Sequence, residues 1–431
     1  MKDLRGRGPI GLNTLGVAEA AAQLAAGEIS SEALVADCLE RIAACDDGLQ
    51  AWAFIDPELA LTQARRCDGE TSRGPLHGVP VGIKDILDTE DMPTEYGSAI
   101  HKGHHPTSDT GCVTALRNAG AVILGKTATT EFASPVPIGV RNPHDFARSP
   151  GVSSSGSAAA VADFMVPVAL GTQTGGSVIL PSAFCGVFGF KGSLNAIDRV
   201  GIRHLRPSLD TLGFMTRSAD DMAIVYSALT ARTAVSRDDA KVPRIGVCRT
   251  PWWGNAQAET VAAIEAAEDS LASSGAEVTS VDLPSVFDTA VDTFGVISAV
   301  EGVTALEQEM KNDFNALNHW IKAVAETREG WTDNDYQSAQ NHAARCRAAL
   351  GEIFDEFDVL LTPSTAGEAT DDLTGISDSS FNRIWTLMHG PCVTIPAYAG
   401  PNDMPVGVQV VGRPGDDANV IEIARWIARH L

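Results

Sequence analysis

The fold is decided by two short loops rich in small residues, Gly151-Val152-Ser153-Ser154-Ser155-Gly156-Ser157 and Gly171-Thr172-Gln173-Thr174-Gly175-Gly176-Ser177. Between them we expect a small-residue helix over 158–163 and a buried strand over 165–170. Small residues let backbone N–H groups point into a cavity without side chains in the way. A serine at the end of such a loop can attack a carbonyl that the loop's own amides hold. Tight turns beside a packed helix show the same pattern, so the loops alone leave both interpretations open.

Lys84 is the candidate base for such a serine. The sequence contains no G-x-S-x-G elbow, and no S-x-x-K precedes a helix. Lys84 ends the apolar stretch Val79–Ile83, which predicts a strand that carries it into the interior. A buried lysine loses its proton because desolvation disfavours the charged form, and it can then act as a general base. The alternative is a lysine paired with Asp85 or with another carboxylate.

Strand and helix patterns alternate along the rest of the chain, which predicts an α/β fold with a largely parallel or mixed sheet. Strands are expected over 79–83, 121–124, 244–248, 277–283, 359–361, 392–395 and 406–411, and helices over 15–26, 31–44, 110–118, 256–273 and 417–429. Gly27 is expected to end the first helix, and Ser30 or Ser31 to cap the second. The range 284–355 has a mostly helical pattern, and we interpret it as an insertion that covers a site.

Composition excludes several classes of function. The formal charge of −23 argues against a nucleic-acid partner, since phosphate contacts need clustered Lys and Arg, and it would repel an anionic membrane surface. The eight cysteines form no C-x-x-C pair, which favours reduced, mostly buried thiols and a cytoplasmic location. No signal peptide or membrane span is indicated. His101, His104 and His105 lack the carboxylate partners and helical spacing of a metal site, so we expect neither metal nor cofactor.

Taken together, Lys84 and the two loops resemble the amidase signature family. Further segments match its motifs in order: 78–85, 125–127 with 131–133, 184–191, 208–210, 215–218, 390–391, 405–409 and 412–414. The family's two catalytic serines are 24 residues apart, as are Ser153 and Ser177, which selects Ser153 over its neighbours. The resemblance runs from about Leu15 to the last helix and so covers nearly the whole chain.

The resemblance implies one large domain, 1–431, with a central mixed sheet flanked by helices on both sides. Within it we expect an N-terminal helical portion (1–70), a catalytic core (78–235) and a variable helical insertion near the substrate pocket (284–355). It also implies a Ser–Ser–Lys relay, in which neutral Lys84 takes a proton from Ser153 and Ser153 takes one from the nucleophile Ser177. Backbone amides of Thr174, Gly175, Gly176 and Ser177 would hold the oxyanion. The family's cis peptide would fall at Val152–Ser153, where the β-branched side chain of Val152 adds crowding to a costly isomer.

Three residues are expected in the substrate pocket: Gln173, Leu180 and Trp385. With Gln173, this chain resembles a Gln-containing subgroup of the family that includes malonamidase-like enzymes. Members of that subgroup usually carry Arg at the position where this chain has Leu180. Leucine there predicts neutral, fairly apolar substrates. Trp385 precedes the Gly390-Pro391 motif, whereas Trp252, Trp253, Trp320 and Trp331 are expected in the core or at the surface.

The resulting expectation is a stand-alone hydrolase of small-molecule, non-peptide amide-type bonds (amides, anilides, carbamates or ureas). Because the family often forms homodimers, a homodimer is one expected assembly. The alternative within the family is the glutaminase subunit of a tRNA-dependent amidotransferase; the shortness of the chain and Gln173 favour the stand-alone enzyme. A remote alternative is nucleotide binding by the phosphate-loop-like string Gly120–Thr127, although its interval 121–124 is expected to be a strand. A catalytically dead binding module is disfavoured because all three relay positions are present.

Overall fold

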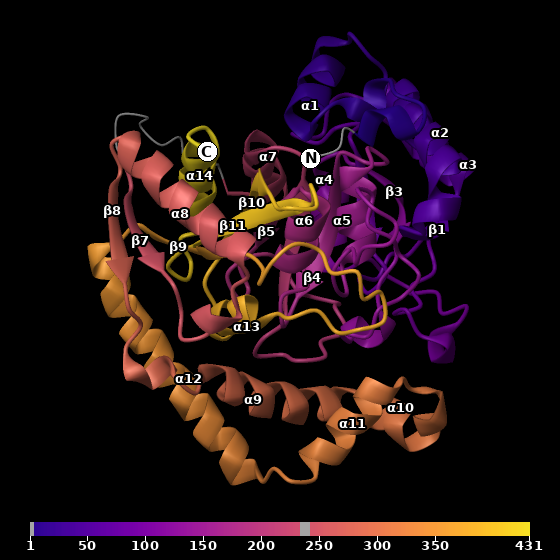
Figure 1. The fold of residues 1–431 in the computed structure, drawn as a ribbon. Helices are drawn as coiled ribbons and strands as arrows, with labels where there is room; N and C mark the ends of the chain where they lie inside the picture. The colour runs from indigo at the N-terminus through magenta and orange to yellow at the C-terminus, as the bar shows by residue number, and fades with distance from the viewer. Residues whose placement is uncertain (1–3, 233–241) are drawn as a thin grey trace.

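A computed structural model describes residues 4–232 and 242–431 of the chain (Figure 1). The last positions of the expected catalytic core, 233–235, lie outside the described residues. The described part contains an 11-stranded sheet in the order β1-β3-β2-β4-β6-β5-β10-β11-β9-β7-β8. Helices flank this sheet, so the prediction of a single α/β domain with a central mixed sheet is confirmed.

The elements alternate along the chain as follows. The strands are β1 (Trp52–Ile55), β2 (Pro80–Lys84), β3 (Val122–Thr127), β4 (Val168–Gln173), β5 (Phe188–Lys191), β6 (Thr211–Thr216), β7 (Arg244–Cys248), β8 (Glu277–Val281), β9 (Val359–Pro363), β10 (Cys392–Ala399) and β11 (Pro405–Val411). The α-helices are α1 (Val17–Ala26), α2 (Ser31–Leu49), α3 (Pro57–Gly69), α4 (Gly111–Asn118), α5 (Ser155–Ala162), α6 (Ile179–Cys185), α7 (Ala219–Thr230), α8 (Ala258–Ser273), α9 (Ala290–Ala305), α10 (Glu307–Asn312), α11 (His319–Arg328), α12 (Asp333–Glu356), α13 (Ser380–Leu387) and α14 (Asp417–Ala428).

Parallel and antiparallel pairing divide the sheet into zones. Strand β2 runs parallel to both β3 and β4, and β7 runs parallel to both β8 and β9. The centre, from β4 through β6, β5, β10 and β11 to β9, is antiparallel. All residues of β2 are buried, which explains why its sequence is a continuous apolar run rather than an alternating one.

Local signals predict some elements correctly and miss others. Gly27 ends α1 in the left-handed conformation (φ 68°), and the Ser30 side chain accepts a hydrogen bond from Ala33 N at the start of α2, as predicted. The N-terminal portion is not wholly helical, because β1 pairs with β3 at the edge of the sheet. The sequence patterns also miss β5 and β6; glycines interrupt both strands, so neither shows a strand period.

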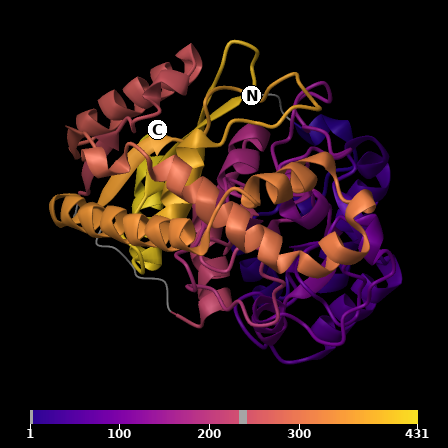
Figure 2. The same cartoon turned by 90° about the horizontal axis from the view of Figure 1, so that it is seen from below.

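Helices α9 to α12 form a separate layer below the sheet in Figure 1. Seen from below in Figure 2, they cross the face of the molecule, and α9 packs against α11, α12 and α13. No helix in the described ranges is long and apolar enough to span a membrane. All eight cysteines are buried and none forms a disulfide, as expected.

Candidate active site

Lys84 lies at the carboxyl end of β2, where its side chain is completely buried. Its Nζ donates hydrogen bonds to Ser153 Oγ at 2.9 Å and to Thr172 Oγ1 at 2.8 Å. The alternative ion pair with Asp85 is not formed: Asp85 pairs with Lys126 instead, at 3.3 Å. Among the described residues, the hydrogen-bond partners of Lys84 are therefore hydroxyl groups and include no carboxylate.

This environment shifts the proton equilibrium of Lys84. Desolvation by burial lowers its pKa to about 7, and the charge of nearby Asp210 opposes only part of that shift. A lysine with such a pKa is substantially unprotonated near neutral pH. It can then accept a proton from the Ser153 hydroxyl, which lies at hydrogen-bond distance.

Ser153 lies in the loop that leads into α5, and neighbouring contacts fix this loop against β4. Ser154 Oγ donates to Thr172 O at 3.2 Å and accepts from Thr172 N at 3.3 Å. The peptide bond between Val152 and Ser153 is trans in the structure and not the cis bond that the resemblance implies.

Ser177 follows β4 in the turn before α6 and is 8% exposed. It lines the same cavity as Val152, Thr174 and Gly175. Within the described residues Ser177 Oγ has no hydrogen-bond partner, so the Lys84–Ser153 contact is present and a Ser153–Ser177 hydrogen bond is not. Such bonds between catalytic groups often form only when substrate is bound.

The turn Thr174–Ser177 presents free backbone donors. None of its four N–H groups donates to an acceptor within the described part of the chain. Gln173 Oε1 accepts instead from the next two N–H groups, those of Val178 and Ile179, each at 3.0 Å. The Gln173 side chain thus holds the start of α6 and leaves the turn's amides available, which is the arrangement an oxyanion hole requires.

Two further contacts fix the turn. Thr174 Oγ1 donates to Asp210 Oδ1 at 2.5 Å, and Asp210 Oδ2 accepts from Leu205 N and Arg206 N. Gly176 has φ 144°, a conformation that side chains disfavour, and a methyl group there would lie 2.8 Å from Asn382 Oδ1. Only glycine fits this position.

A cavity of about 580 Å³ opens above the turn. Its walls come from the turn, from α9, from α11 and from the start of α13. Most lining residues are apolar, with the charged groups Arg206, Asp292 and Arg383 among them. The cavity can therefore hold a small organic molecule against Ser177, with a few charged groups to orient it.

The expectation that Gln173, Leu180 and Trp385 line the substrate pocket is corrected by the structure. All three lie in the core, and none lines the cavity. Leu180 packs with Val152, Phe184, Ala369 and Met404. Gln173 holds the start of α6, and Trp385 packs between α13 and its neighbours. The basis for expecting a neutral substrate fails with Leu180, since that position does not face the cavity.

Sequence reasoning misses the residues that do line the cavity. Trp320 and Trp331, expected in the core or at the surface, form part of its wall, together with Arg206 and Arg383. Their sequence neighbourhoods carry no local signal of a site. Only the segment 284–355 is expected near a pocket, and α9 and α11 lie within it.

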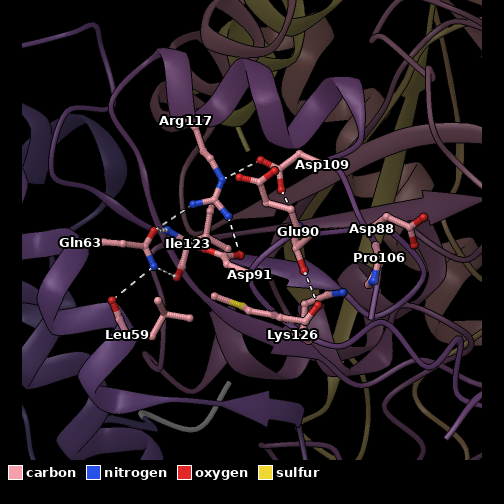
Figure 3. A network of polar contacts seen from close by, with 12 residues as sticks. Leu59, Gln63, Asp88, Glu90, Asp91, Pro106, Asp109, Arg117, Ile123 and Lys126 are labelled. Carbon is pink, nitrogen blue, oxygen red and sulfur yellow. Dashed lines mark hydrogen bonds and ion pairs between the residues drawn. The ribbon is translucent and has the colours of Figure 1, made fainter. Parts of the chain in front are cut away.

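The geometry of Gly120–Thr127 argues against nucleotide binding by this phosphate-loop-like segment. Residues Val122–Thr127 form β3, and Lys126 is completely buried within it. Lys126 Nζ donates to Thr94 Oγ1 at 2.5 Å and to Pro93 O at 3.2 Å. In Figure 3 it lies beside the polar network that Arg117 forms with Gln63, Asp91 and Asp109. A lysine held in this way cannot reach a phosphate.

Comparisons with known proteins identify the family of this chain. The sequence model of the Amidase family matches residues 33–421. Two curated relatives are both named as a component of glutamyl-tRNA(Gln) amidotransferase. That of Anaeromyxobacter sp. (strain K) is 33% identical over 97% of this chain and 96% of its own length. That of Chloroflexus aggregans (strain MD-66 / DSM 9485) is 30% identical over 96% and 95%.

Solved structures give the same result. An amidase superposes with a TM-score of 0.88 at 28% identity, covering 97% of this chain and 100% of that one. The peptide amidase of Stenotrophomonas maltophilia superposes with a TM-score of 0.85 at 29% identity, covering 98% of each chain. The names of these relatives do not single out the malonamidase-like subgroup, which stays a prediction.

Proposed function

This chain belongs to the amidase family and is an amide C–N hydrolase, and from that premise we propose that it works through an acyl-enzyme on Ser177. The observation that carries the proposal is the buried Lys84, whose pKa is lowered and whose Nζ lies 2.9 Å from Ser153 Oγ. A buried lysine with a hydroxyl partner and no carboxylate partner is suited to accept a proton.

The proposed reaction has two halves. Neutral Lys84 accepts the Ser153 proton while Ser153 accepts the Ser177 proton, and Ser177 Oγ attacks the amide carbonyl. The N–H groups of Thr174 to Ser177 bind the tetrahedral oxyanion. The proton then returns through Ser153 to the leaving nitrogen, the C–N bond breaks, and water attacks the resulting ester by the same relay to release the acid and restore Ser177.

Two roles within the family are candidates for this chain, and they differ in substrate. One is a stand-alone amidase, and the other is the glutaminase subunit of a tRNA-dependent amidotransferase. The curated relatives favour the second, because both are named as a component of glutamyl-tRNA(Gln) amidotransferase. The alignment covers 96% of the first relative, so chain length gives no argument for a stand-alone enzyme. Gln173 gives none either, because it serves to hold α6.

The net charge of this chain bears on whether it could itself contact tRNA in the amidotransferase role. A chain with a formal charge of −23 is a poor surface for tRNA phosphates. In the amidotransferase role, partner subunits would therefore supply the contacts to RNA, and this chain would hydrolyse glutamine. We keep the cytoplasmic location as a proposal, supported by eight buried cysteines without disulfides.

The test combines a substrate-independent probe with a substrate comparison. A fluorophosphonate should label Ser177 in the wild-type protein, with loss of fluoride, and should not label Ser177→Ala. The Ser177→Ala protein should lose turnover of any substrate by at least about 10³-fold while keeping the wild-type unfolding temperature. Near-normal turnover in this variant would contradict the proposal. Glutamine hydrolysis that appears only with a co-purified partner would decide for the amidotransferase role.

A further inference from the structure

Two arginines line the cavity without any ion-pair partner in the described part of the chain. Arg206 is 5% exposed, and its Nε donates to Ser298 Oγ at 2.8 Å. Arg383 is partly buried, and its Nε donates to Ser379 Oγ at 3.0 Å. In both guanidinium groups the outer nitrogens have no hydrogen-bond acceptor among the described residues. Each is therefore a charged donor that faces the cavity without an acceptor.

The carboxylates around these arginines are engaged elsewhere. Asp210 and Glu301 are the acidic neighbours of Arg206. Asp210 binds Thr174 and the backbone N–H groups of Leu205 and Arg206, and the Glu301 carboxylate accepts from Ser208 and Tyr336.

The same holds for Arg383. Its acidic neighbour Asp378 accepts from Ser380 and Asn255. Asp292, the one carboxylate in the cavity lining, is exposed. None of these carboxylates forms an ion pair with either guanidinium.

Arg383 also has the right position relative to the reaction. It lies on α13, whose N-terminal end packs over the nucleophile turn. A methyl group on Gly175 would lie 4.0 Å from Arg383 Cγ, so the arginine stem runs beside the turn that carries Ser177. A group bound by Arg383 would therefore lie in the same cavity as Ser177.

We propose that Arg383, with Arg206 as a second contributor, binds a carboxylate of the substrate, so the preferred substrate is a short amide that also carries a carboxylate. Desolvating two guanidinium groups is costly unless an anion pairs with them, and a carboxylate offers the planar, bidentate geometry that arginine matches. The inference rests on the proposed function. It reverses the expectation of a neutral substrate, and both an acidic-amide hydrolase and a glutaminase fit it.

Matched substrates test the inference. In the first pair, succinamate carries a carboxylate on the acyl side where butyramide has a methyl group. In the second pair, N-butyrylglycine carries a carboxylate on the amine side where N-ethylbutyramide has a methyl group. In at least one pair, wild-type kcat/KM should favour the charged member tenfold or more. Arg383→Gln should lower that ratio at least tenfold, mainly through KM, and Arg383→Lys should restore part of it. Arg206→Gln should lower it less. Glutamine is run in parallel as a zwitterionic substrate.

The control is Arg345→Gln, which removes the same charge from an exposed position on α12 outside the cavity and should keep the wild-type ratio. Equal or better turnover of the neutral members, or an Arg383→Gln variant that slows both members equally, would overturn the inference. If no member is turned over, calorimetry on Ser177→Ala decides: equal affinity for charged and neutral members also overturns it. Fluorophosphonate labelling of Ser177 reports separately on the proposed function, because that probe carries no carboxylate.

Discussion

The catalytic segment and the helical layer differ in almost every physical respect. All residues of α5 are buried, as is Lys84 at the end of β2. In α11, by contrast, Ile321 is the one buried residue, although Trp320 and Val324 on the same helix line the cavity. The groups proposed to perform the chemistry are thus fixed by a close-packed interior, while part of the cavity wall comes from α11, which has one buried residue.

Polar contacts attach the helical layer to the rest of the molecule. His101 Nε2 and Glu309 Oε1 on α10 are 2.9 Å apart, and Arg203 also binds Glu309. Near the start of α11, Asn318 N donates to Glu131 Oε2 at 2.8 Å. These contacts are partly buried, and they add to the apolar packing of α9 against α13.

The largest effect should come from the buried base. Lys84→Met removes the proton acceptor while keeping much of the side chain's volume, so we expect kcat to fall about 10³-fold. Stopped-time assays with the best substrate measure the rate, and circular dichroism with thermal unfolding checks the fold. A variant that keeps its fold and more than about a tenth of the wild-type rate would contradict the role of Lys84.

The next effect tests the geometry of the turn. Gly176→Ala places a methyl group 2.8 Å from Asn382 Oδ1 at φ 144°, so the turn must move. We expect kcat to fall about 10²-fold through displaced oxyanion donors, and stability to fall by about 1–3 kcal/mol. The control is Gly254→Ala, which has open space around it. Similar kinetics for the two variants would show that the turn does not hold the oxyanion.

The pH dependence should follow Lys84. Its pKa is lowered to about 7 by burial, and the proposed relay requires the unprotonated form. Below that pKa kcat/KM should therefore fall about tenfold per pH unit, and above it the value should level off. A rate that rises as the pH drops below 7 would assign the base to another group. The profile requires a substrate that does not itself titrate in this range.

The smallest effect should come from the helical layer. Trp331→Ala removes an apolar wall of the cavity from a residue that is 36% exposed, so we expect KM to rise about threefold to tenfold, with kcat changed less. Trp253→Ala, outside the cavity lining, is the matched control. If Trp331→Ala lowered kcat as strongly as a change in the turn, the separation between the two regions would be wrong.

Much of the fold follows from local patterns, and the failures have physical causes. Gly27 and Ser30 mark helix ends because caps depend on the residue itself and its immediate neighbours. Strand β1 escapes prediction because it has four residues and pairs with β3, which is distant in sequence. Leu180 is expected in the pocket because the Gln-containing subgroup usually carries Arg at that position, yet α6 directs it into the core.

The sequence, through its resemblance to the amidase signature family, determined the residues of the candidate relay. A lysine at the end of a buried strand and two serines in small-residue loops are properties of short segments, and their order and spacing restrict what they can form. The tertiary structure decided which side chains face Ser177 and what charge they carry. Arg206 and Arg383 are far apart in the chain, and only the packing of the sheet and its helices brings both into the wall of one cavity. No local pattern encodes that proximity, because it depends on how distant elements pack.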